Sequence, residues 1–337
     1  MPVEIFLSKA NAEPEYETID EADVLDTDEV VEHITEEPKE GEEGEPKQKA
    51  KIVKRPVSLS DIHPLWTKNP SDCTKDDYIE FYRKVFMDYK EPLFWIHLNM
   101  DYPFNLKGIL YFPKINTEYD SIEGTIKLYN NQVFIADNIK EVIPEFLLLL
   151  KGVIDCPDLP LNVSRSALQN DGFVQKISEY IAKKVADKLT GMCKTDREAY
   201  EKYWDDISPF IKFGCIKDSK FADKLHDYIL FKDLDNKYLT LKDCIEANKK
   251  EEAEHTEEET QENAEENKDE KEPEKTTVFY VTDPVQQSQY INMFKEAGKN
   301  AVILSHNIDT AFISHLEQRD QTLQFKRIDA DLTEELK

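Results

Sequence analysis

The chain has 337 residues, 34% of them charged, and most of its net charge of −27 lies in two stretches, residues 13–50 and 251–275, with local charges of −13 and −10. The rest is nearly balanced, so no basic face is predicted for a nucleic-acid partner. Five widely spaced cysteines without a C-x-x-C pair predict neither a disulfide framework nor a zinc site, and no stretch approaches the about 20 apolar residues of a membrane helix. We therefore expect a cytoplasmic protein without membrane contact.

The N-terminal residues predict two kinds of segment. Residues 1–12 contain a short apolar run that resembles a strand without a partner nearby, and we expect it to be the last strand of a preceding domain. Residues 13–60 are predicted to be an acidic flexible linker. Repulsion between carboxylates and the scarcity of aromatic side chains leave too little apolar area to offset the entropy of ordering.

Residues 61–193 predict a large αβα module. Thr74 followed by Asp77 is typical of a capping box that begins a helix. Short aromatic and β-branched runs, which predict the strands of one sheet, then occur at 94–98, 109–112, 125–129 and 133–135. A helical stretch is expected at 139–150. Apolar residues at spacings of three and four then predict a core-packed helix at 172–190.

The last part of the chain predicts a helical connector followed by a second, smaller module. Helices are expected at about 195–212 and 219–230 within the connector, residues 194–245. Residues 246–276 are a low-complexity acidic run, predicted to be a disordered insertion, with helix as the alternative because Glu, Ala and Lys favour it. Residues 277–337 alternate as a βαβαβ unit. The predicted fold class is therefore α/β (α+β), with two αβα modules, large then small, a helical segment between them and disordered acidic linkers.

The run Leu-Pro-Leu-Asn-Val-Ser-Arg-Ser-Ala-Leu-Gln at 159–169 is the most specific candidate for chemistry. A guanidinium such as that of Arg165 binds phosphate oxygens with two parallel hydrogen bonds and keeps its charge, which suits it to stabilise a phosphoryl group in transfer. Gln169, four residues later, would project from the same helical face. The alternative is that Arg165 is a solvated or ion-paired surface residue. The sequence contains neither G-x-G-x-x-G nor G-x-x-x-x-G-K-[ST], so no phosphate-binding glycine loop is predicted.

Three motifs in order, at residues 64–72, 146–155 and 159–169, resemble the middle domain of the ninety-kilodalton heat-shock chaperone family, bacterial HtpG type. The likeness spans about residues 62–243 and 277–332. It implies that the chain is a fragment, preceded by an ATP-binding domain and lacking a C-terminal dimerisation domain. The chain departs from the family at the 246–276 insertion and at Ser166 and Ala167, which replace the acidic and larger residues common after the arginine.

The resemblance implies a split active site. ATP and Mg²⁺ would be bound by the N-terminal domain, Arg165 would contact the γ-phosphate after the domains close, and Gln169 would support it. The full-length protein would couple ATP hydrolysis to protein folding, whereas this fragment alone would be an inactive monomer without a cofactor or metal of its own. The expected partners are the chain's own N-terminal ATPase and C-terminal dimerisation domains, unfolded client proteins and other chaperones.

The same resemblance assigns client binding to exposed apolar side chains, at Tyr89 and Phe134, with Trp95 as a further candidate by proximity. Each has an alternative as a core residue, since an aromatic side chain on a short strand is usually buried.

Two rival functions remain open. One is a non-catalytic protein-interaction module in which Arg165 is structural. The other is a free-standing α/β enzyme using residues 277–328, but the Asp283-Pro284 turn there has no glycine-rich loop.

Overall fold

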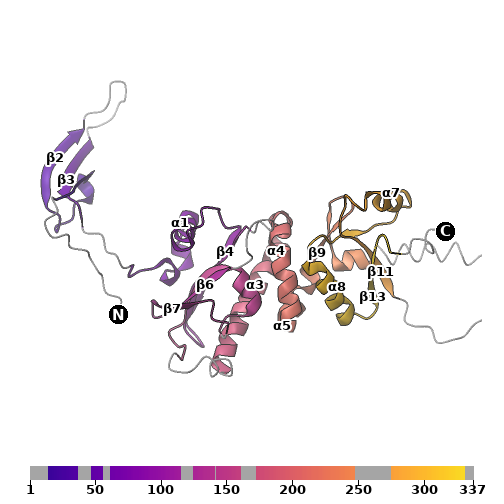
Figure 1. Cartoon of the computed structure of the whole chain (residues 1–337). Coiled ribbons are helices and arrows are strands. Elements are labelled where there is room, and N and C mark those ends of the chain that lie inside the picture. The colour runs from indigo at the N-terminus through magenta and orange to yellow at the C-terminus, as the bar shows by residue number, and fades with distance from the viewer. Residues whose placement is uncertain are drawn as a thin grey trace, which may run out of the picture. The chain divides into compact units, whose positions relative to one another are not determined.

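The computed structural model describes residues 14–36, 47–55, 61–114, 124–140, 142–160, 172–246 and 275–330. The chain divides into two compact units, Met1–Pro64 and Leu65–Lys337 (Figure 1). The strand predicted within 1–12 and residues 247–274 of the predicted insertion lie outside the described residues.

The first unit is a three-stranded antiparallel sheet of order β1-β3-β2. Its strands are β1 (Tyr16–Asp20), β2 (Val30–Glu36) and β3 (Lys47–Val53), with a 3₁₀ turn at Glu21–Asp23. The structure thus differs from the flexible linker predicted for 13–60. Lysine-rich β3 lies between two acidic strands, with Asp20 opposite Lys49 and Glu32 opposite Lys51. Opposite charges across neighbouring strands stabilise the pairing. The large net negative charge of the chain does not reveal these individual pairs.

The second unit contains a larger five-stranded sheet of order β4-β5-β8-β6-β7. The strands are β4 (Phe94–Met100), β5 (Leu106–Phe112), β6 (Thr125–Asn130), β7 (Val133–Asp137) and β8 (Lys151–Asp155). Only the β6–β8 pairing is parallel. Side chains of β5 alternate between two cores: Ile109 and Tyr111 belong to one, and Leu110 and Phe112 to the other. Both faces of this sheet are therefore covered.

Helices supply the outer layers of this module, which confirms the predicted αβα arrangement. Helix α1 (Lys75–Phe86) begins with the predicted capping box, in which Thr74 and Asp77 exchange side-chain and backbone hydrogen bonds. It packs with the 3₁₀ turn Leu65–Thr67 against the Tyr111 side of the sheet. Helices α3 (Gly172–Thr195) and α4 (Arg197–Lys217) belong to the core on the other side.

The helix predicted at 139–150 is wrong for most of its length, because the described residues of this stretch form only a 3₁₀ helix, Glu145–Leu149. Pro144 immediately precedes this 3₁₀ helix, with φ −50° and ψ 137°. The run of leucines ends the 3₁₀ helix, and Leu150 leads directly into the central strand β8. A further short 3₁₀ helix occurs at Pro70–Asp72, before α1.

The predicted helical connector ends in a β-hairpin rather than a helix. Helix α5 (Ser219–Leu225) and a 3₁₀ turn (His226–Tyr228) are followed by β9 (Leu230–Asp233) and β10 (Tyr238–Thr240). The helix predicted at 219–230 is therefore too long. In the hairpin turn Asn236 has a φ of 62°, and Asp233 Oδ1 accepts the N–H groups of Asp235 and Lys237. Asn and Asp favour such turns.

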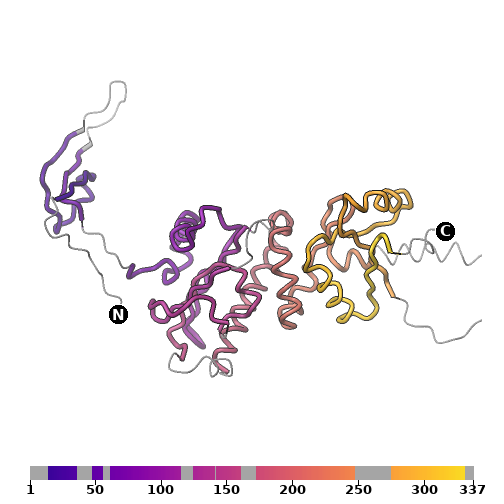
Figure 2. The backbone as a smooth tube through the Cα atoms, viewed as in Figure 1, coloured from indigo at the N-terminus to yellow at the C-terminus, as the bar shows by residue number. Residues whose placement is uncertain are grey.

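The hairpin extends the smaller sheet, whose order is β10-β9-β12-β11-β13. Strands β11 (Thr276–Val281), β12 (Val302–Ile303) and β13 (Leu323–Arg327) are parallel and alternate with α7 (Ser288–Glu296) and α8 (Ile308–Arg319), which confirms the βαβαβ prediction. Within this second unit the backbone runs from the larger sheet through α3, α4 and α5 into the smaller sheet (Figure 2).

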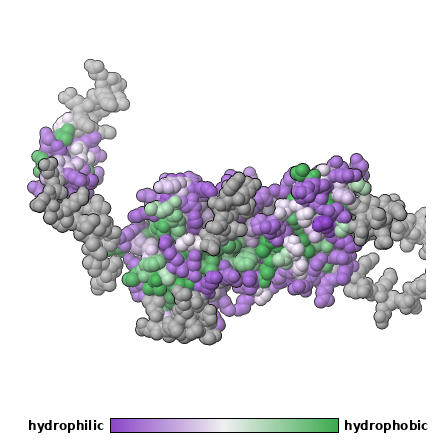
Figure 3. All heavy atoms as spheres, in the orientation of Figure 1, coloured by the Kyte–Doolittle hydropathy of each residue, from purple (hydrophilic) through white to green (hydrophobic). Residues whose placement is uncertain are grey.

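On the face seen in Figure 3, the surface of the second unit is largely hydrophilic, and hydrophobic side chains gather in separate patches between hydrophilic ones. Within the described ranges, no helix is long and apolar enough to cross a membrane.

Candidate functional site

The two residues predicted to act on nucleotide, Arg165 and Gln169, lie outside the described residues, in the segment 161–171. The structure describes both flanks of that segment: β8 and residues 156–160 before it, and α3 from Gly172 after it. The site can therefore be built from its base, residues 155–160, which we call the root.

Hydrogen bonds with β6 and with the residue just before β5 fix the root. Asn130, the last residue of β6, donates from Nδ2 to the carbonyl oxygens of Cys156 and Pro157, both at 3.1 Å. The N–H of Cys156 donates to the carbonyl of Tyr129 at 3.1 Å. On the other side, Asp158 Oδ2 accepts the N–H of Asn105 at 2.7 Å. The chain thus enters segment 161–171 from an anchored position.

Asp155, at the end of β8, is the buried carboxylate of the root, with 4% of its surface exposed. Its Oδ2 accepts the indole N–H of Trp66 at 3.1 Å and the backbone N–H of Gln132 at 2.9 Å. Its Oδ1 is buried and has no hydrogen-bond donor among the described residues. Sequence reasoning missed this residue as a functional candidate, because its indole partner is 89 positions away in the chain.

The aromatic residues predicted to bind clients separate into two groups. Tyr89 is 82% exposed and Phe134 is 48% exposed, although Phe134 packs edge-on against Tyr129 with ring centroids 5.6 Å apart. Trp95 is only partly exposed and stacks on Tyr78, with centroids 4.9 Å apart. Tyr89 and Phe134 therefore offer accessible apolar surface, whereas much of Trp95 contributes to packing.

The turn that carries Tyr89 is held by its neighbour Asp88. Asp88 Oδ2 accepts hydrogen bonds from Tyr82 Oη at 2.7 Å and from Lys151 Nζ at 2.6 Å. Burial opposes ionisation of Asp88, but the hydrogen bonds from Lys151 and Tyr82 outweigh it and lower its pKa. The ion pair between Asp88 and Lys151, the first residue of strand β8, thus holds the turn that carries the exposed Tyr89.

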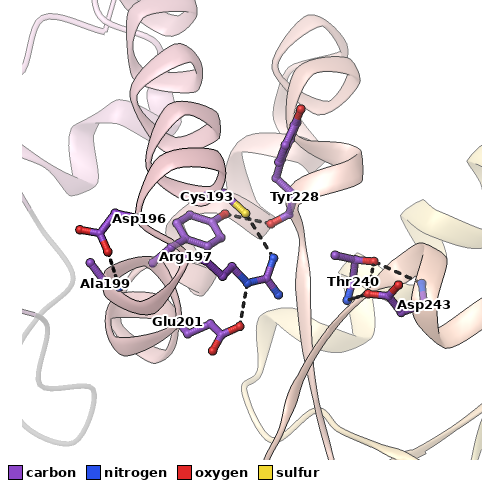
Figure 4. A network of polar contacts seen from close by, with 9 residues as sticks. Cys193, Asp196, Arg197, Ala199, Glu201, Tyr228, Thr240 and Asp243 are labelled. Carbon is purple, nitrogen blue, oxygen red and sulfur yellow. Dashed lines mark hydrogen bonds and ion pairs between the residues drawn. The ribbon is translucent and has the colours of Figure 1, made fainter.

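The junction of α3 and α4 contains a polar network (Figure 4). Arg197 donates to Glu201 Oε1 at 2.7 Å and to the sulfur of Cys193 at 3.4 Å, and Tyr200 Oη donates to the carbonyl of Tyr228 at 2.9 Å. Burial raises the pKa of the Cys193 thiol, and the Arg197 guanidinium offsets only part of this effect. Cys193 therefore has the buried surroundings that are typical of a structural cysteine.

A buried ion pair connects α4 with the smaller module. Lys212 Nζ lies 2.5 Å from Asp309 Oδ1, and the two side chains are 6% and 5% exposed. Asp309 Oδ2 also accepts the N–H of His306 at 2.9 Å. The pair therefore joins the start of α8 to the C-terminal part of α4 (Figure 1).

Two observations bear on cofactors. Within the described ranges, no three His, Cys, Asp or Glu side chains gather in a way that could hold a metal ion. A groove of about 570 Å³ lies between the β4–β5 turn and helices α3 and α5, and it is lined by Tyr102, Phe104, Tyr180 and Phe221 together with lysines and the carboxylates of Glu179 and Asp218. Its lining therefore combines aromatic side chains with charges of both signs.

Comparison with known proteins gives consistent matches. The family model described as Hsp90 protein matches residues 1–334. The chain is 41% identical over 279 residues to chaperone protein htpG of Bacteroides fragilis, covering 82% of this chain and 38% of that protein. It is 40% identical over 279 residues to chaperone protein HtpG of Porphyromonas gingivalis, covering 81% of this chain and 37% of that protein.

A solved structure shows the same fold. The middle domain of a putative heat shock protein of Plasmodium falciparum superposes with a TM-score of 0.56 at 20% identity, covering 79% of this chain and 99% of that one. The chain spans about 38% of the length of the curated relatives it matches. The fold and the family thus agree with the resemblance seen in the three sequence motifs.

Proposed function

Because the chain belongs to the Hsp90 protein family, we propose that it works as the middle segment of an ATP-dependent molecular chaperone. Its relatives carry the name chaperone, and it has the fold of a heat-shock middle domain. Its partners in this proposal are an ATP-binding domain, a dimerisation domain, unfolded clients and other chaperones, in the cytoplasm.

In this proposal Arg165 completes the ATPase. Its guanidinium contacts the γ-phosphate of ATP, which a separate domain holds together with Mg²⁺, and Gln169 assists. The observation that carries the proposal is the anchored root: Asn130 and Asp158 fix the backbone just before the segment that contains Arg165. A positive charge on a fixed base stabilises a transition state better than one on a free loop, because little reorganisation is needed as charge develops.

The chain's own contribution to the chemistry is therefore electrostatic. ATP bound elsewhere supplies the phosphoryl group, and Arg165 offers a planar, permanently charged fork that matches phosphate oxygens. Lysine at this position would keep the charge but lose the two-point geometry.

The test is Arg165→Ala in the full-length protein, with steady-state ATP hydrolysis and ATP affinity measured separately. Removing a charge clamp of this kind costs about 10²-fold or more in turnover. We expect kcat of Arg165→Ala to fall by that amount while the affinity for ATP stays unchanged. Arg165→Lys should recover only part of the lost kcat. Turnover within twofold of wild type would instead support an interaction module in which Arg165 is structural.

We also propose that Tyr89 and Phe134 form part of the client-binding surface, because both are exposed large apolar side chains, and Asp88 holds the turn that carries Tyr89. The probe is an unfolded polypeptide, reduced and carboxymethylated α-lactalbumin, titrated into the full-length protein. Tyr89→Ser and Phe134→Ser should each weaken binding roughly tenfold, as truncation of an interface aromatic often does. Tyr102→Ser is the matched control, since Tyr102 is 87% exposed. Equal losses in all three variants would show nonspecific adhesion instead.

A further inference from the structure

The groove between the β4–β5 turn and helices α3 and α5 has an apolar floor whose side chains are fixed by packing. Phe104, on the turn, is buried, and its ring centroid lies 5.7 Å from that of Tyr180 on α3. Phe221, in the first turn of α5, is also buried. The N–H of Asn105 donates to Asp158 at 2.7 Å, which holds the turn in place. Such a preformed groove loses little conformational entropy when it binds a ligand.

Two lysines of α3 give this groove a positive rim. Lys176, Tyr180 and Lys183 all line it, and their spacings of four and three residues place them on one face of the helix. Both lysines are exposed, and neither forms an ion pair with any residue in the described part of the chain. The aromatic ring of Tyr180 thus lies between two ammonium groups that are available to a ligand.

The other charged side chains of the groove already have partners. Lys220 Nζ lies 2.7 Å from Glu179 Oε1, and Lys224 Nζ lies 2.8 Å from Asp187 Oδ1. Asp218 caps α5, where its Oδ1 accepts a backbone N–H at 3.0 Å. The lining contains four lysines and two carboxylates, so its net charge is +2 in a chain whose total charge is −27. The groove therefore favours an anionic ligand with an apolar part.

The spacing of the two lysines indicates how such a ligand is arranged. The seven residues from Lys176 to Lys183 correspond to a rise of about 10 Å along the helix. In an extended peptide, alternate side chains lie on one face, and side chains four positions apart are separated by about 13 Å. Two carboxylates at that separation, with an apolar side chain midway, match the order Lys176, Tyr180, Lys183. The flexible lysine side chains can span the remaining difference.

We propose that this groove binds an extended acidic segment of a protein partner, in which a large apolar side chain lies midway between two carboxylates four positions apart. The apolar side chain packs on Phe104, Tyr180 and Phe221, and the carboxylates pair with Lys176 and Lys183. Desolvating the apolar side chain supplies affinity, and the two ion pairs supply specificity. The inference does not depend on the proposed role of Arg165.

Fluorescence anisotropy of the labelled peptide Gly-Glu-Ser-Phe-Ser-Glu-Gly, titrated with the full-length protein, tests this proposal. We expect saturable one-to-one binding that weakens about tenfold in Lys176→Glu and in Lys183→Glu, because each change places like charges together. The matched control is Lys202→Glu, since Lys202 is an exposed lysine of α4 outside the groove lining. Its affinity should stay within twofold of wild type.

Variant peptides test the two parts of the ligand without changing the protein. Serine in place of the phenylalanine should weaken binding at least tenfold, because the apolar anchor is lost. Lysine in place of both glutamates should abolish measurable binding. N-acetylphenylalanine, which has only one carboxylate, should compete at least tenfold more weakly than the unlabelled peptide.

Four results would overturn the proposal. Equal losses in Lys202→Glu and in the groove variants would show general attraction between an acidic peptide and surface lysines. Binding that does not need the phenylalanine would remove the role of the apolar floor. Equal competition by N-acetylphenylalanine would assign the groove to small amphipathic anions. Binding that appears only after deletion of residues 251–275 would identify that acidic run of the same chain as the occupant.

Discussion

Replacing Asp309 with alanine should weaken the attachment of the smaller module to α4. The change removes the only carboxylate that the structure places on Lys212 within the described part of the chain, at 2.5 Å, in a setting where the lysine side chain is 6% exposed. The ammonium would then be buried without its counter-charge. Its position 5.8 Å from the centroid of the Phe312 ring would compensate only partly.

The expected loss is large. Removing one partner of a buried ion pair typically costs about 3–5 kcal/mol, because the remaining charge is left uncompensated. The N–H of His306 also loses its acceptor, although that group can regain water as α8 loosens. We therefore expect a decrease of about 4 kcal/mol in the free energy of unfolding, against a total of about 5–15 kcal/mol for a typical domain.

Urea denaturation followed by circular dichroism measures this change, and hydrogen exchange at α8 locates it. The control is Lys295→Ala, which breaks the pair with Asp235 at a similar distance, 2.8 Å, but with side chains 45% and 64% exposed. An exposed pair contributes about 0–1 kcal/mol. The double change of Lys212→Met with Asp309→Leu should recover most of the stability, since well-packed apolar residues can replace a buried pair. A loss below about 1 kcal/mol in Asp309→Ala would refute this reasoning.

Three further predictions concern the N-terminal sheet and α1. Salt at 1 M, which shortens the screening length to about 3 Å, should lower the melting temperature of the β1-β3-β2 sheet, and an unchanged melting curve would contradict charge pairing across it. The hydrogen bond from Arg55 lowers the pKa of Asp28 to about 2, so its stabilising contribution is complete above the ordinary value of 3.8 and is lost as the pH falls toward 2. Asp28→Asn should remove that part of the acid unfolding profile. Met87 ends α1 with a φ of 51°, so Met87→Gly should stabilise the protein by about 0.5–1 kcal/mol in thermal unfolding, and destabilisation would show that the Met87 side chain contributes more than its backbone strain costs.

Local patterns in the sequence are sufficient to predict several helices and strands. The Thr74–Asp77 capping box and the apolar stripe of α3 each depend on contacts within one or two helical turns, so the residues themselves encode them. The βαβαβ unit is likewise visible because strand and helix periods alternate along the chain.

The structure differs from the sequence-based predictions where residues far apart in the chain determine the fold. Asp20 and Lys49 are both polar and look like linker residues separately, but they lie opposite each other in the N-terminal sheet. The β9–β10 hairpin is stabilised by joining β12, a strand about 70 positions further on, and propensity over a short window cannot reveal such a partner.

In the candidate site, too, some residues can be predicted from the sequence and others only from the folded structure. Arg165 and Gln169 were suggested by a motif and stay predictions, since their segment lies outside the described residues. The hydrogen bond from the Trp66 indole to buried Asp155 joins residues 89 positions apart, and only the folded arrangement reveals it. The sequence also does not predict that Tyr89 is exposed whereas Trp95 is stacked on another ring, because both are aromatic residues close together in the chain.

Calorimetric titration of ATP with Mg²⁺ tests the split active site most directly. It should be done once with this chain alone and once with the full-length protein. We predict no measurable binding heat for the chain alone and a stoichiometric site in the full-length protein, because in the proposed split active site another domain holds the nucleotide. Tight, one-to-one nucleotide binding by this chain alone would contradict the account.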